Sequence, residues 1–218
     1  MLPTGFSVYP IMGQSYPKEA YAWVDLSAEK LRSLGIEAEE DLGEYLSKQH
    51  QSSQARYLWG GYLEKRSLYK SELFVGSDPE HIRDIHLGID IWGVVYDVIY
   101  APLDGIIHSF AYNQGHLDYG YTLVLQHQVD GHTFFTLYGH LGESYYSSWK
   151  VGQVVKAGDA LGDIGPKESN GGWLPHLHFQ CIQDMESSEG DYPGVCSSAD
   201  LYRFEQICPD PSFLIAPI

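Results

Sequence analysis

The chain is short of positive charge. Of its 218 residues, 13 are Lys or Arg and 29 are Asp or Glu, which gives a formal net charge of -16 at pH 7. A surface this acidic repels nucleic acids and anionic membranes, so we expect neither as a partner. The sequence also lacks any run of roughly 20 apolar residues that could span a bilayer.

Cysteine is equally scarce. Cys181, Cys196 and Cys208 form no CxxC pair, and their odd number fits a reducing compartment. The sequence leaves open whether Cys196 and Cys208 pair. Because the amino terminus lacks a basic segment followed by an unbroken apolar segment, we expect a cytoplasmic protein. Removal of a leader from a longer precursor would instead indicate a periplasmic or secreted protein.

Three common catalytic signatures are missing. The chain has no HExxH helix, no Gly-x-Ser-x-Gly elbow and no Walker loop, which excludes the helical zinc-protease arrangement. Internal repeats and low-complexity tracts are absent too. What is present is a globular composition, with 44% hydrophobic residues, 19% charged residues and 17 Tyr.

The first part of the chain, residues 1–80, indicates a partly helical extension packed on the core. Ser27 is a candidate N-cap for a helix over 28–34 that ends at Gly35, and a second helix is expected over 37–52. The aromatic and basic stretch 55–74 predicts no clear element. Packing against the main domain is the favoured interpretation of this extension, and lining a substrate groove is the alternative.

Short apolar runs separated by turn residues follow over residues 81–183. Strands are expected at 90–101, 105–112, 121–129, 132–139, 153–157 and 176–182. This pattern predicts a mainly β protein with an antiparallel sheet or sandwich and a small α-helical N-terminal part. Residues 184–218 contain Pro193, Gly194, Pro209, Pro211 and Pro217 and are expected to form a tail that wraps the surface.

Three histidine clusters indicate a metal site. "HLGID" contains His86 and Asp90, "PHLHF" contains His176 and His178 on one face of a strand, and "LYGHL" contains His140. Catalytic zinc takes three protein ligands of the His or carboxylate type and keeps one position open. Two His and one Asp meet that need, which leaves two histidines for proton transfer. In the extended "HLGID" segment, Gly88 is expected to leave room for the ion.

The other histidines are single and are expected to be surface or satisfied residues. They are His50, His81, His108, His116, His127 and His132.

Four segments in order resemble the lysostaphin/LytM-type zinc endopeptidase family: "HLGIDIW", "YGYTLVLQHQVDGHTFFTLYGHL", "VGQVVKAGDALGDIG" and "GGWLPHLHF". The resemblance implies a LytM-like antiparallel β fold and one Zn²⁺ ion. It implies His86, Asp90 and His178 as zinc ligands and His140 and His176 as the catalytic pair. Which of the two takes the proton stays open.

The resemblance also implies a substrate. Family members cut glycine-containing peptides or peptidoglycan cross-bridges and stems, so we expect a zinc-dependent endopeptidase or amide hydrolase. Two departures put the substrate in doubt: Gln180 replaces a frequent Glu, and the loop 166–173 adds Trp173. The stretch 60–74 and the tail resemble a subgroup fused to kinase-like and aminotransferase domains.

Other interpretations remain at this stage. A catalytically silent LytM-like binding or regulatory module is one, and a zinc hydrolase of a non-peptide amide is another. "APLDGIIHSF" and "VGQVVKAGDALGDIG" also resemble the halves of a biotinyl or lipoyl carrier. A carrier displays its modifiable lysine on a hairpin tip between these halves. Here the intervening residues 111–150 contain a single lysine, Lys150, which lies just before "VGQ" and not at a hairpin tip. The oligomeric state is not indicated by the sequence.

Overall fold

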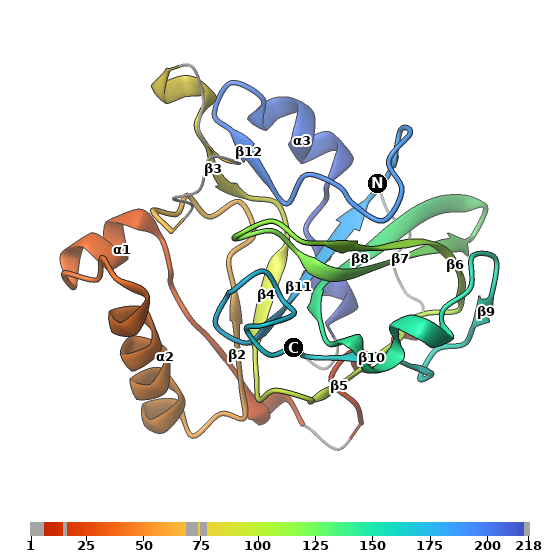
Figure 1. Cartoon of the computed structure of the whole chain (residues 1–218), viewed down its shortest axis with the longest axis horizontal. Helices are drawn as coiled ribbons and strands as arrows, with labels where there is room; N and C mark the ends of the chain where they lie inside the picture. The colour runs from red at the N-terminus through yellow and green to blue at the C-terminus, as the bar shows by residue number, and fades with distance from the viewer. Residues whose placement is uncertain (1–6, 15–16, 69–73, 75–77, 216–218) are drawn as a thin grey trace.

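The computed structural model describes residues 7–14, 17–68, 74 and 78–215 (Figure 1). Part of the ambiguous stretch 55–74 therefore lies outside the described residues. The helices are α1 (Ala28–Ser33), α2 (Glu39–Ser53) and α3 (Leu201–Ile207), with short 3-10 turns at Lys18–Ala20, Pro79–His81, Glu143–Ser148 and Pro211–Leu214. The strands are β1 (Tyr21–Trp23), β2 (Tyr57–Gly60), β3 (Arg83–His86), β4 (Ile89–Trp92), β5 (Val98–Tyr100), β6 (Gly105–Asn113), β7 (Gly120–Val129), β8 (His132–Leu141), β9 (Val154–Val155), β10 (Ala160–Asp163), β11 (His176–Ile182) and β12 (Val195–Ser197).

One large sheet organises the molecule. Its eight strands run in the order β1-β2-β4-β11-β8-β7-β6-β9, and every neighbouring pair is antiparallel except β1–β2. Two small two-stranded sheets, β5–β10 and β3–β12, flank it. The predicted mainly β, antiparallel LytM-like fold with a small helical N-terminal part is confirmed.

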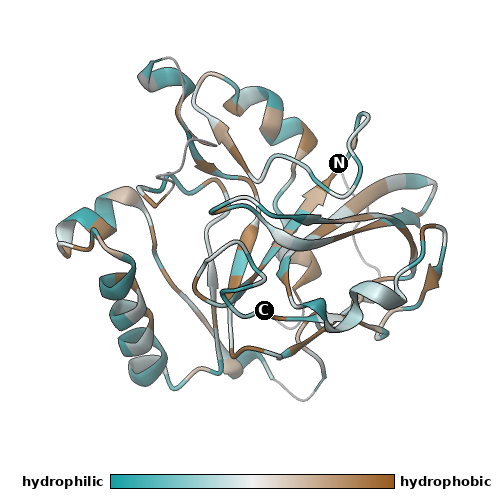
Figure 2. Cartoon of the chain, viewed as in Figure 1, coloured by the Kyte–Doolittle hydropathy of each residue, from teal (hydrophilic) through white to brown (hydrophobic). Residues whose placement is uncertain are grey.

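Both expected N-terminal helices are present and lie together on one side of the sheet (Figure 1). The Ser27 hydroxyl accepts a hydrogen bond from the backbone N–H of Lys30, which satisfies one of the free donors at the start of α1. The residues of α2 are mostly hydrophilic (Figure 2), and the helix buries only Leu42 and Leu46. These leucines pack with Leu58 and Trp92, and so tie the helix to strands β2 and β4.

The expected strand 90–101 divides in two. The backbone N–H of Val94 donates to the Asp97 carboxylate, and Asp97 N–H returns a bond to the Val94 carbonyl. A side chain on Gly93 would collide with that carboxylate, at 2.8 Å. The resulting turn ends β4 and starts β5 in a different sheet, because a short side chain that bonds the backbone competes with the strand ladder.

The two faces of the large sheet have different roles. One face is an apolar core to which alternate residues of the central strands contribute, among them Leu123, Leu125 and Phe179. The opposite face of β4 and β11 presents Asp90 and His178. Farther along that face, a second apolar cluster is covered by the C-terminal segment, including α3.

Segments outside residues 81–183 are thus part of the same framework. Strands β1 and β2 extend the sheet beyond β4, and β12 pairs with β3. The division at residues 80 and 183 stays a prediction. All three cysteines are free and buried, and among the described residues no helix is long and apolar enough to cross a membrane.

Candidate metal centre

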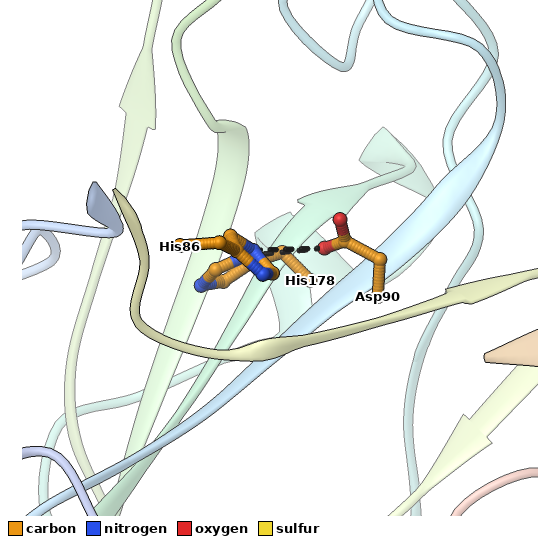
Figure 3. A group of neighbouring side chains, drawn as sticks. All are labelled: His86, Asp90 and His178. Carbon is orange, nitrogen blue, oxygen red and sulfur yellow. Dashed lines mark hydrogen bonds and ion pairs between the residues drawn. The ribbon is translucent and has the colours of Figure 1, made fainter. Parts of the chain in front are cut away.

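Three side chains converge on the second face of the sheet. His86 ends β3, Asp90 lies in β4, and His178 lies beside Asp90 in the antiparallel register of β4 with β11 (Figure 3). His86 Nε2 is 2.9 Å from His178 Nδ1 and 3.3 Å from Asp90 Oδ1, and His178 Nδ1 is 3.2 Å from the same oxygen. The structure therefore brings the three predicted ligands together.

This triangle fits a small divalent ion. Nitrogen and oxygen ligands bound at about 2.0–2.2 Å to a tetrahedral zinc lie roughly 3.3–3.6 Å apart. The three donor-to-donor distances, 2.9, 3.2 and 3.3 Å, are close to that spacing. The three residues form the group of His, Cys, Asp and Glu side chains that could hold a metal within the described part of the chain. The donor chemistry, two imidazoles and one carboxylate, is the kind that zinc prefers.

Hydrogen bonds on the far side of each imidazole fix its tautomer. His86 Nδ1–H donates to the Gly61 carbonyl at 2.9 Å, and His178 Nε2–H donates to Gln180 Oε1 at 3.0 Å. Gln180 is itself held by the Pro193 carbonyl and by Cys208 Sγ. The nitrogens left without a proton are the two that face each other across the site, as metal ligation requires.

Gly88 has a different function from the expected one. The chain bends between β3 and β4, so "HLGID" is not one extended strand. A Cβ on Gly88 would lie 2.8 Å from the His178 ring and 2.7 Å from the Phe179 carbonyl. The glycine therefore makes room for the His178 imidazole, and its absent side chain does not face the space between the ligands.

Arg66 is a member of the site that the sequence did not reveal. Its guanidinium, 3% exposed, donates to Asp90 Oδ2 and at 2.7 Å to Glu64 Oε1. Asp90 is thereby held by one oxygen, which leaves the other, Oδ1, for the histidines. Arg66 comes from the N-terminal extension, and its neighbours in sequence form no motif, so only the folded chain places it here.

The other two predicted histidines lie beside the cluster. The rings of His140 and His176 are 4.4 Å apart, centroid to centroid, and His176 Nε2 is 3.6 Å from Asp90 Oδ1. His176 Nδ1–H donates to the Leu174 carbonyl and His140 Nδ1–H to the Asn170 carbonyl. In the neutral rings, Nε2 is then the proton acceptor. Trp92 stacks on His176.

The loop 165–173 sets the position of His140. Asn170 is fully buried, and its side chain bonds the backbone of Gly165, Gly172 and Trp173. The same residue offers its carbonyl to His140, which lies at the end of β8 with a left-handed φ of 63°. A non-glycine residue in that conformation costs of order 1 kcal/mol or more, so tertiary contacts must hold it.

Burial and neighbouring charges determine the protonation of the cluster. Burial, with the Arg66 cation, lowers the pKa of His86 to about 3. Burial alone favours a protonated Asp90, but nearby His86 and Arg66 outweigh it and hold the pKa of the carboxyl well below its usual value. Burial also lowers the pKa of His140 and His176. The neutral imidazoles around a carboxylate match the state in which such groups bind a metal.

A cavity of about 470 Å³ opens over these residues. The N-terminal extension contributes Leu26, Leu42 and Arg66 to its wall, and Trp173 lies over the two catalytic candidates. The extension therefore packs on the core and lines the cavity as well. His116, which was expected to be unrelated, also lies at this cavity.

Two of the other single histidines, His127 and His81, have hydrogen-bond partners away from the site. His127 is buried between the Asp104 carbonyl and the Thr136 hydroxyl. His81 pairs with Asp78 at the surface.

An antiparallel sheet that carries a His/Asp/His donor set beside two further histidines is the arrangement that the resemblance to LytM-type peptidases implies. Residues 84–189 match the model of Peptidase family M23 and form a domain of that family, which confirms the resemblance found in the sequence. No curated protein matches the chain.

Solved structures are similar to parts of the chain. A zinc-containing peptidase from Vibrio cholerae is 26% identical, covers 49% of this chain and 32% of its own, and has a TM-score of 0.38. This chain thus spans about a third of the Vibrio protein. The catalytic domain of the antimicrobial peptidase lysostaphin from Staphylococcus simulans is 22% identical. The match covers 56% of this chain and 80% of the lysostaphin domain, with a TM-score of 0.37. A mutant catalytic domain of the prophage-encoded M23 protein EnpA from Enterococcus faecalis is 21% identical. The match covers 62% of this chain and 88% of the EnpA domain, with a TM-score of 0.39.

Proposed function

We propose that the chain is a zinc-dependent hydrolase of peptide or amide bonds. His86, Asp90 and His178 hold one Zn²⁺, and His140 and His176 are the catalytic pair. The observation that supports this most is the convergence of three unprotonated ligand atoms within 3.3 Å of one another, in a cavity that also holds two further histidines. Membership of residues 84–189 in a peptidase family supports the same reaction class.

When bound, zinc supplies Lewis acidity toward the scissile carbonyl and the attacking water. The protein supplies proton transfer and charge stabilisation. Because their Nδ1–H groups are bonded to the Asn170 and Leu174 carbonyls, His140 and His176 each keep Nε2 free to accept a proton. One imidazole orients the attacking water by accepting a hydrogen bond at Nε2. The other takes the proton of that water, and the imidazolium so formed stabilises the oxyanion and returns the same proton to the leaving amine.

The peptide class of substrate follows from the family. Glycine-containing peptides are the first set to test, and peptidoglycan-like peptides are the second. The trait that favours a peptide over an unrelated amide is the cavity wall, in which Trp92, Trp173 and Leu174 give an apolar surface next to the histidines.

Two alanine substitutions test the proposal. His86→Ala removes a ligand, so we expect zinc and activity to be lost together. His140→Ala should keep one zinc per chain and lower kcat by about 10²–10⁴-fold, because only the proton transfer is lost. Zinc content is measured by atomic emission and activity with a peptide and amide library. His132→Ala, an exposed histidine on β8, is the matched control.

Other outcomes identify other functions. Full activity in His140→Ala would overturn the catalytic assignment. Zinc binding without turnover of any library member would indicate a silent binding module. Turnover of amides but of no peptide would indicate a non-peptide amide hydrolase.

A further inference from the structure

Four segments contribute to the wall of the cavity over the candidate metal centre, beside single residues such as Leu26 and Leu68. They are residues 37–42 around the start of α2, residues 116–119 of the loop 115–119 before β7, residues 172–174 of the loop 166–174 before β11, and the segment 191–195. Residues 37–42 and 191–195 lie outside the part of the chain that matches the peptidase family. They are therefore additions of this chain to the family domain.

The first junction joins segment 191–195 to loop 115–119. The backbone N–H of Leu87 donates to the Gly194 carbonyl, which fixes the segment next to the metal ligands. Gly194 lies directly against the phenol of Tyr119, and a Cβ at this position would collide with the phenolic oxygen. These two walls therefore touch and leave no gap between them for an extended peptide.

The second junction joins loop 115–119 to loop 166–174. Leu117 N–H donates to the Gly171 carbonyl at 2.8 Å. Gly171, at a left-handed φ of 86°, packs so closely on the Asp118 backbone that a Cβ would overlap it. Only glycine permits that approach, so the contact is built into the sequence.

The third junction joins loop 166–174 to α2. Lys167 forms an ion pair with Glu39 in the first turn of the helix. Leu174 packs into the cluster that holds α1 and α2 and lies 3.8 Å from the Cβ that Gly43 lacks. An apolar contact and an ion pair thus close this side as well.

Three of the four junctions around the cavity are closed. An endopeptidase that cuts the middle of a polymer needs a groove open at both ends, and among the described residues these contacts leave only one of the four sides open. The volume of the cavity, about 470 Å³, is within the range of small-molecule pockets. The catalytic candidates His140 and His176 at its floor are only 5% and 6% exposed.

The mouth of the cavity is acidic. Away from the metal cluster, its described lining includes the carboxylates of Glu37, Glu39, Asp118 and Asp191, with Arg83 as a cation. Glu39 is paired with Lys167. Because these carboxylates repel an anionic ligand, the acidic lining favours a ligand with a positive charge over an anionic one.

We infer that the cavity takes a short substrate with a free ammonium group, a peptide of a few residues or a small amino amide, and not an internal segment of a long polymer. This inference rests on the proposed function and narrows its substrate class.

The test uses zinc-loaded full-length protein and three matched peptide libraries. The first contains free tetrapeptides, the second the same peptides N-succinylated, and the third the same sequences centred in 16-residue peptides. We expect kcat/KM to be about 100-fold or more lower for the centred sequences, because flanking residues meet the closed rim. Succinylation should lower it by about tenfold or more through charge repulsion.

Variants of the rim test the charge separately. Asp118→Asn and Asp191→Asn should raise KM for free tetrapeptides about threefold or more without loss of zinc. Asp130→Asn, in the exposed turn between β7 and β8, is the control and should leave KM unchanged.

The outcomes are distinguishable. Cleavage of centred sequences within about tenfold of the free peptides would overturn the inference and leave the proposed function intact. Equal cleavage of succinylated peptides would overturn its charge component. Protein that binds no zinc, or that binds zinc and cleaves neither these three libraries nor any small amide, would overturn the proposed function and this inference with it.

Discussion

At the scale of single residues, the site depends on how each ligand is held from behind. Gly61, Gln180 and Arg66 each bond one of the three donor side chains. Such outer contacts orient the ligands and fix their tautomers, and their loss commonly weakens metal binding by about 10–100-fold. Arg66 has the largest electrostatic role of the three, because it is a buried cation between two carboxylates.

Replacing Arg66 tests that role. Arg66→Met leaves the Asp90 and Glu64 carboxylates buried side by side without their common cation. Removing one partner of a buried ion pair costs about 3–5 kcal/mol, so we expect a loss of that size in urea unfolding with a chelator present. Adding zinc should restore part of the lost unfolding free energy, since the ion also neutralises Asp90.

The control is Arg203→Met. Arg203 pairs with Glu186, but both side chains are about half exposed. Exposed pairs contribute roughly 0–1 kcal/mol, so this variant should unfold almost as the parent does. An equally small effect of Arg66→Met would show that the buried triad does not stabilise the site.

The five residues proposed for the metal centre and the catalytic pair could be singled out from the sequence, because His86, Asp90, His140, His176 and His178 fall in short motifs. Arg66 could not be named, since it reaches Asp90 from a segment with no motif. The sequence predicts that Gly88 leaves room for the ion, and this is wrong. The neighbour that needs the space is the His178 ring, whose approach depends on the bend between two strands.

At the scale of elements, the register of β4 with β11 creates the site. It places Asp90 opposite His178, and His176 opposite Trp92. Periodicity predicts such strands and which residues share a face, but not which strands become neighbours. The parallel pairing of β1 with β2 and the division of 90–101 depend on contacts distant in sequence or on a side-chain turn.

The loop before β11 is the element that most directly positions His140, one of the two proposed catalytic residues. Asn170→Ala removes the side-chain bonds that shape this loop, and so shifts the carbonyl that holds His140. We expect kcat to fall by about tenfold or more while zinc content stays at one per chain. Ser169→Ala, which removes one partly exposed hydroxyl of the same loop, is the control. Loss of zinc in Asn170→Ala would mean that the loop supports the metal site and not His140.

A buried histidine in the β6–β7–β8 ladder makes stability depend on pH. Burial lowers the pKa of His127 to about 4, against about 6.5 in the unfolded chain. The Asp104 carboxylate, the nearby charge, opposes this shift only in part. Because the folded pKa is depressed, the stabilisation is present above pH 6.5 and is lost as the pH falls toward 4, by up to roughly 3 kcal/mol.

Comparing His127→Gln with the parent isolates this effect. Other buried histidines change stability in the same direction, but they do so in both proteins. The unfolding free energy of the variant, measured in urea at pH 7.5 and pH 4.5, should fall less between the two than that of the parent. An identical fall in both would contradict the role of His127.

At the scale of the whole molecule, segments before and after the family domain complete the sheet and enclose the cavity. Leu26, Leu31 and Leu58, from the first 80 residues, are fully buried. Each contributes roughly 1.5–3 kcal/mol by burial, which is a large part of a total stability of roughly 5–15 kcal/mol. A chain of residues 81–218 alone should therefore lack a cooperative thermal transition in circular dichroism. A truncated chain that melts as sharply as the full one would show that the extension is an independent addition.

The claim on which all else depends is that one zinc is held by His86, Asp90 and His178. Anomalous diffraction at the zinc edge, from crystals grown with one equivalent of zinc, tests it most directly. We predict a single peak about 2.0–2.2 Å from His86 Nε2, Asp90 Oδ1 and His178 Nδ1. A peak bound by His140 or His176, or no peak among these residues, would contradict the account.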